Sequence, residues 1–243
     1  MSTLPHPERV SPGRPGPLAE SIVALAGTPD HASGVEQRLA AIAALAAERV
    51  AAADYAAVTT LHGRACTTVA AGSDIALAVD EAQFADWAGL RLRAPETGEP
   101  AEVPDLAATM SWPGFHEVAS ALGLRAPTSV QLYGGRGTTI AVLDLYGRDE
   151  AAMKPLITGL AELCDTSREP GRDPPVCDPG AGELLTGYAG ALSVRAIIQL
   201  AVDILAGNTA DRVDAAYTEL CARAAANGTS LTVAATGVLK RFL

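Results

Sequence analysis

The chain has 243 residues and about half of them are apolar, which is enough to build a sizeable hydrophobic core. Its formal net charge of −10 disfavours long-range attraction to nucleic acid, although from residue 184 onward five basic residues stand against four acidic ones. The N-terminus lacks the apolar run of a signal peptide, and no stretch is both long and uncharged enough to cross a bilayer. The four cysteines form no C-x-x-C pair and are expected to be reduced thiols. We therefore expect a cytoplasmic protein that does not enter membranes.

Two segments rich in proline and glycine divide the chain. Residues 1–17 are expected to form a disordered leader. Residues 166–182, TSREPGRDPPVCDPGAG, are predicted to be a linker, because such a composition does not continue a helix. The sequence therefore predicts a larger domain at 18–165 and a smaller one at 183–243.

The larger domain mixes helix and strand patterns. A helix is predicted at 34–50, with Leu39, Ile42, Ala43 and Ala46 on its buried side. The elements predicted after it are two strands at 55–63 and 64–72 with a tight turn near His62, a helix at 80–89, an extended piece at 97–106, a helix at 112–124, a strand pair around the glycine-rich loop 134–137, and a helix at 149–164. This order predicts an α+β fold with an antiparallel sheet flanked by helices.

The smaller domain is predicted to be an all-α unit of three helices. The first spans about 184–206, and Gly207 with Asn208 ends it. The second runs to about 226 with Val213, Tyr217, Leu220 and Ala224 on one face, and the third begins after Thr229 or Ser230 with Leu231, Ala235, Val238 and Phe242 on one face.

The stretch ALSVRAIIQLAVDILA at 191–206 is apolar on nearly all sides of a helix, except for a stripe formed by Arg195, Gln199 and Asp203. A helix of this kind is covered on most sides. Two short partner helices cover only part of it, so we expect the rest to face the larger domain or a second copy of the chain. The polar stripe is then expected to be the solvent-exposed edge of this helix.

This helix resembles the start of an ANTAR domain, the RNA-binding antiterminator module of bacterial regulators. The resemblance covers about 184–240, and the matching positions are Ala191-Leu192, Arg195, Ile198, Ala201, Leu205, Ala216-Tyr217, Leu220, Leu231 and Val233-Ala234. Two positions depart from the pattern: Asp203 stands where the family has glycine, and Val202 where lysine is common.

The larger domain resembles a GAF sensor domain of the kind that accompanies ANTAR in actinobacterial proteins. The stretches that carry the resemblance, in order, are TGEPAEVPDL at 97–106, SWPGF at 111–115, GLRAPTSVQL at 123–132 and TTIAVLDLYGRDEAAM at 138–153. A GAF domain binds small ligands between its sheet and helices, which implies Trp87, Phe115 and Tyr133 as wall residues of such a pocket. The alternative is that all three pack in the core.

The ANTAR resemblance implies binding of paired RNA hairpins in a nascent transcript. Basic side chains would contact phosphates and polar or aromatic ones would meet loop bases. The candidates are Arg195, Arg212, Tyr217, Arg223, Lys240 and Arg241, with Asn208 and Asn227 as further base partners. The alternatives are that Arg195 pairs with Gln199 or Asp203 on its own helix, that Tyr217 packs in the core, and that the last two basic residues complement a helix C-terminus.

The resulting hypothesis is a homodimeric, non-enzymatic transcription antitermination regulator with a GAF sensory and dimerisation domain. Nucleophile-elbow, P-loop and zinc-protease motifs are absent from the sequence. The pair His62 and Cys66 offers too few ligands for a metal, and nothing identifies a cofactor or the sensed ligand. The alternative hypothesis is a dimeric sensor or interaction protein whose ANTAR-like helices serve assembly and no longer bind RNA, which Val202 and Asp203 favour.

Overall fold

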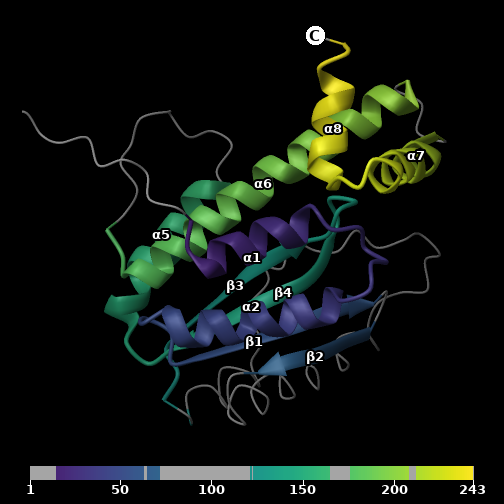
Figure 1. The fold of residues 1–243 in the computed structure, drawn as a ribbon. Helices are drawn as coiled ribbons and strands as arrows, with labels where there is room; N and C mark the ends of the chain where they lie inside the picture. Colours follow the sequence, from purple (N-terminus) through teal and green to yellow (C-terminus); the bar gives the residue numbers. More distant parts are fainter. Residues whose placement is uncertain are drawn as a thin grey trace, which may run out of the picture.

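The computed structural model describes residues 15–62, 65–71, 121, 123–164, 176–207 and 212–242. These residues form an α+β structure with six helices and a four-stranded antiparallel sheet in the order β2-β1-β4-β3 (Figure 1). The elements are α1 (Pro17–Ala26), α2 (Val35–Arg49), β1 (Tyr55–His62), β2 (Ala65–Ala71), β3 (Ala126–Tyr133), β4 (Thr139–Gly147), α5 (Glu150–Cys164), α6 (Pro179–Ala206), α7 (Val213–Ala226) and α8 (Leu231–Leu239). The predicted elements at 80–89 and 97–106, and most of that at 112–124, lie outside the described residues.

The sheet confirms both predicted strand pairs. β1 pairs with β2, and β3 pairs with β4 across the glycine-rich loop, while β4 also pairs with β1 and so joins the two hairpins. Leu143 in β4 stands between Val58 of β1 and Val130 of β3, and all three are buried. These side chains belong to the hydrophobic core, to which α1 and α2 also contribute.

The helix at 34–50 is confirmed as α2, with its predicted side buried. Helix α1, however, was not predicted. It begins at Pro17, the last residue of the expected leader, and buries Leu18, Ile22 and Leu25. Proline at the first helical position costs nothing, because the N–H it lacks would have no partner there. The proline that reads as disorder is therefore the start of a core helix.

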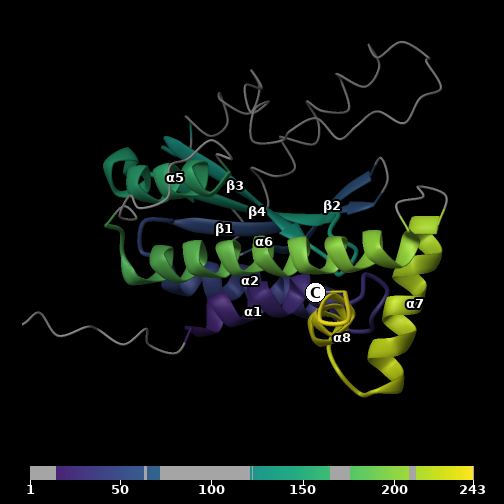
Figure 2. The ribbon, with the colours of Figure 1, turned by 90° about the horizontal axis from the view of Figure 1, so that it is seen from above.

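Helix α6 begins at Pro179, five residues before the predicted start and inside the segment predicted to be a linker. The carboxylate of Asp178 caps it by accepting hydrogen bonds from the N–H groups of Gly180 and Ala181, each at 3.0 Å. A capping acid followed by proline is a favourable helix start. The result is one helix of 28 residues that runs above α1 and reaches α7 (Figures 1 and 2).

Two sets of partners cover α6. Its first half packs on α1 so closely that a Cβ added at Gly187 would lie 2.8 Å from the Cα of Ala19. Its second half packs against α7 and α8. The larger domain is thus one of the predicted covers of this apolar helix. By length and composition α6 could also cross a bilayer, contrary to the expectation that no stretch is long and apolar enough. The core helix of a soluble protein can have the same length and composition, so this property is weak evidence for a membrane span.

Helices α7 and α8 confirm most of the predicted faces. The predicted positions found buried are Tyr217, Leu220, Ala224, Leu231, Ala235 and Val238. Two assignments were wrong. Val213 is 38% exposed because it is the first residue of α7, and Phe242 is 68% exposed because α8 ends three residues earlier, at Leu239.

Candidate functional site

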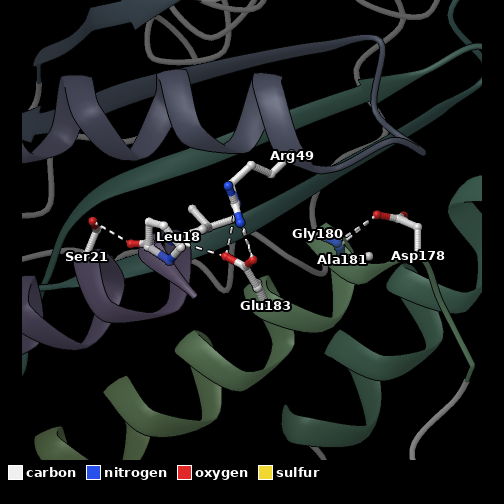
Figure 3. A network of polar contacts seen from close by, with 8 residues as sticks. Leu18, Ser21, Arg49, Asp178, Gly180, Ala181 and Glu183 are labelled. Atoms are coloured by element: carbon white, nitrogen blue, oxygen red, sulfur yellow. Dashed lines mark hydrogen bonds and ion pairs between the residues drawn. The ribbon is translucent and has the colours of Figure 1, made fainter. Parts of the chain in front are cut away.

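A network of polar contacts fixes the start of α6 to the part of the molecule formed by the four strands with α1, α2 and α5, which we call the sheet part (Figure 3). The Arg49 guanidinium, at the end of α2, donates to both carboxylate oxygens of Glu183, with the shortest contact at 2.7 Å. The backbone N–H of Leu18 donates to the same carboxylate at 3.3 Å. Hydrogen bonding to Arg49, more than any other contact, lowers the pKa of Glu183. Both α1 and α2 therefore hold the N-terminal end of α6.

The β3–β4 loop, residues 134–138, lies between the sheet part and the C-terminal helices α7 and α8, a region that we call the junction. Its Gly135 N–H donates to Thr28 O at 2.8 Å, and the Arg136 N–H donates to Asp30 Oδ1 at 3.1 Å. A Cβ at Gly135 would lie 2.6 Å from both Thr28 O and a methyl group of Leu231 in α8. Only glycine fits there, so the loop touches α8 directly.

Two arginines make reciprocal contacts across this junction. Arg195 of α6 donates from Nε to Gly137 O at 2.7 Å, and its guanidinium carbon lies 4.6 Å from the centre of the Tyr133 ring in β3. In the other direction, Arg136 of the loop lies over the Tyr217 ring of α7 at 5.0 Å and contacts Asp214 at 3.2 Å. Each part of the molecule thus places a cation on a tyrosine of the other, an attraction of about 0.5–2 kcal/mol per pair.

These contacts decide where several predicted RNA-binding residues lie. Arg195 is half-buried against the loop, so it does not belong to a solvent-exposed edge of α6. Its partner is Gly137 of the loop, not Gln199 or Asp203 of its own helix, which are exposed. Tyr217 is 7% exposed, and burial, more than any neighbouring charge, raises its pKa. The core interpretation of Tyr217 is therefore the one the structure supports.

The remaining candidates divide into two places. Arg223 forms an ion pair with Glu219 on its own helix, and it lines a groove between α7 and α8 together with Asn227 and Arg241. The groove has a volume of about 450 Å³, and its other lining residues are Thr229, Val233, Ala234, Gly237 and Val238. Lys240 and Arg241 are exposed at the end of α8. Arg212 is exposed at the opposite end of α7.

Tyr133 is the one predicted ligand-wall residue within the described chain; Trp87 and Phe115 lie outside it. Tyr133 is 5% exposed, stacks on Tyr188 of α6 with ring centres 6.2 Å apart, and borders a cavity between β3, α5 and α6. Asn208 and the side chain of Cys66 also lie outside the described parts. Among the residues that the structure describes, no cluster of three His, Cys, Asp or Glu could hold a metal ion.

Sequence reasoning missed Arg136, Tyr188 and Glu183 as organising residues. Only Arg136 carried a usable signal, because an arginine between glycines at a hairpin tip must project from the sheet. Comparison with known proteins identifies no functional residues, because no family model, curated protein or solved structure matches the chain.

Proposed function

We propose that the protein is an RNA-binding transcription antitermination regulator with a GAF-like sensory and dimerisation domain and an ANTAR-like helical unit. The observation that carries the proposal is the α7–α8 groove, which brings Arg223 and Arg241 together with the amide of Asn227. Arginine suits phosphate contacts. The Asn227 Nδ2 donates to the backbone oxygen of Arg223 at 2.7 Å, so the Asn227 Oδ1 is the atom left to accept a hydrogen bond from the edge of an unpaired base. An RNA hairpin loop would enter this groove.

The groove replaces the surface suggested by the sequence pattern. Arg195 is occupied by the β3–β4 loop, and Lys240 extends the basic surface beside Arg241. Glu219 holds Arg223 on an exposed helix surface, where such a pair contributes at most about 1 kcal/mol. A phosphate can therefore displace it at low cost.

Sensing would reach the groove through α6. This helix is anchored by Glu183 to the sheet part and packs at its other end on α7 and α8. A signal that shifts the sheet part would shift the helix as a rigid body. We further propose a cytoplasmic homodimer in which the outer face of α6, with Leu200 52% exposed, meets its copy and presents two grooves to paired hairpins.

The test is binding of the full-length protein to a labelled panel of paired RNA hairpins at two salt concentrations. Arg223→Ala/Arg241→Ala is compared with Arg38→Ala/Arg125→Ala, which removes the same charge from exposed positions of the sheet part. We expect the groove variant to bind more weakly and to reduce the salt slope by about 1 for each lost phosphate contact, while the control keeps the parent slope. Equal losses in the two variants would contradict the proposal.

A second candidate function is a dimeric sensor or interaction protein whose ANTAR-like helices serve assembly. The engagement of Arg195 and Tyr217 inside the molecule favours it, because two of six predicted RNA contacts are used for packing. Absence of RNA binding at both salt concentrations, with a dimer retained in light scattering, would establish this alternative over the first.

A further inference from the structure

The cavity between β3, α5 and α6 has the size and lining of a small-molecule site. Its volume is about 280 Å³, close to the lower end of the range of about 300–1,000 Å³ for ligand pockets. Apolar side chains of α5 form much of its wall, namely Ile157, Leu160 and Ala161, and Val130 of β3 also borders it. A ligand that fills it must be compact, about the size of a single substituted ring.

One group of polar side chains at the cavity centres on Gln131, while the Ser129 hydroxyl, also in the lining, donates to Asp144. The Tyr133 hydroxyl donates to Gln131 Oε1 at 2.9 Å, and the Thr139 hydroxyl lies 3.4 Å from the same oxygen. The Tyr188 hydroxyl follows at 3.3 Å from that of Tyr133, and Cys164 Sγ lies 3.8 Å from Tyr188. Since the oxygen of Gln131 accepts from these hydroxyl groups, its amide N–H is the group that this lining residue has left to donate.

The lining selects against charge. None of the described residues that line the cavity is an acid, an arginine, a lysine or a histidine. Burial, followed by the hydrogen bond to Tyr133, raises the pKa of Tyr188 well above its ordinary range, so its hydroxyl stays neutral. A charged ligand would lose its hydration without gaining a counter-charge from these lining residues.

We infer that this cavity is a binding site for a compact, uncharged organic molecule whose oxygen accepts a hydrogen bond from Gln131. The ligand would pack its apolar body on Ile157 and Leu160. The inference rests on the sensory half of the proposed function and gives it a ligand class.

The cavity is also connected to the rest of the junction. Tyr133 borders the cavity and carries Arg195 on its ring, and Arg195 in turn holds Gly137 of the β3–β4 loop. The neighbouring Arg136 lies over Tyr217 of α7. A ligand that moves Tyr133 therefore acts on the loop and, through it, on α7.

The test uses three matched probes with the full-length protein and no RNA, so its result is independent of RNA binding. Acetophenone is neutral and has an acceptor oxygen, isopropenylbenzene replaces that oxygen by CH₂, and benzoate is charged. Calorimetry and ligand-observed NMR measure their binding. We expect saturable binding of acetophenone, about fivefold weaker binding of isopropenylbenzene, and benzoate weaker by at least about tenfold.

Two variants locate the site. Ala161→Phe narrows the cavity from an exposed position on α5 and should weaken acetophenone binding at least about tenfold, whereas Ala152→Phe, exposed on the same helix but outside the lining, should leave it unchanged. Gln131→Leu should remove the preference for acetophenone over isopropenylbenzene, whether or not Ala161→Phe folds. Lack of saturable acetophenone binding, equal effects of the two phenylalanine variants, or an unchanged preference in Gln131→Leu would overturn the inference.

Discussion

Replacing Gly187 with alanine tests the close packing of α6 on α1. Alanine is favoured over glycine inside a helix by about 1 kcal/mol, so propensity alone predicts a more stable protein. At Gly187, however, the new Cβ would lie 2.8 Å from Ala19 Cα and 3.2 Å from Ala19 O. Both are backbone atoms of α1, which can only give way if the helix moves.

The matched control is Gly182→Ala, in the same helix, where a Cβ would meet nothing within 4 Å. Propensity favours alanine at both positions, and at least as strongly at Gly187 in the helix interior, so a less stable Gly187→Ala reports the packing cost of about 1–3 kcal/mol for an overfilled interface. We therefore expect Gly182→Ala to be more stable than the parent protein by up to about 1 kcal/mol, and Gly187→Ala to be less stable than Gly182→Ala by about 1–3 kcal/mol.

Urea unfolding measures the effect through the transition midpoints, which can be compared directly if the slope is unchanged. In thermal unfolding the same difference corresponds to about 2–4 °C for each kcal/mol in a chain of this size. Equal stability of the two variants would refute the close approach of the two helices and, with it, the rigid attachment of α6 to the sheet part.

Three further outcomes are expected. Asp178→Ala removes the cap of α6 and should lower the free energy of unfolding by about 1 kcal/mol, measured by urea titration; an unchanged midpoint would contradict the cap. Pairing with Arg49 lowers the pKa of Glu183, so the ionised carboxylate contributes its full stabilisation above about pH 4.3, the ordinary pKa of glutamate in the unfolded chain. This stabilisation is lost as the pH falls through the lowered pKa of the folded state. Glu183→Gln should remove this part of the pH dependence of the free energy of unfolding. Arg195→Lys should lower the free energy of unfolding by about 1–2 kcal/mol, because lysine has no Nε–H at that position to donate to the Gly137 carbonyl. Asp203→Asn, at an exposed position of the same helix, should leave it unchanged, and equal effects of the two variants would refute the contact.

The local elements of the fold were predictable where one periodic pattern dominated. The buried side of α2, the two hairpins and the cap at Ser230, whose Oγ accepts from Val233 N at 3.3 Å, follow from residue spacing and turn chemistry. Prediction failed at Pro17, which was assigned to a disordered leader, and at Pro179, which was assigned to a linker that could not continue a helix. Each proline instead occupies the first turn of a helix, α1 and α6 respectively. A proline's effect depends on its position within the helix, and that position is set by packing far away in sequence.

The candidate site was less predictable because its contacts join distant segments. The spacing of four between Arg195 and Gln199 suggested a stripe on one helix, but the partner of Arg195 is Gly137, 58 residues earlier. A helical pattern identifies which residues share a face. It does not identify what lies opposite that face, so an arginine that holds a loop has the same pattern as one that awaits RNA.

The shared helix has a consequence for how this chain can be divided. Leu184, Tyr188 and Ala191 of α6 are buried with the sheet part, while Ala201 and Val202 on the same helix belong to the core near α7 and α8. Heat should therefore melt the molecule in one cooperative transition rather than two. For the same reason, dividing the chain within residues 166–182 would expose core residues of the sheet part that α6 covers. The helical unit could therefore not be transferred to another protein as an independently folded domain.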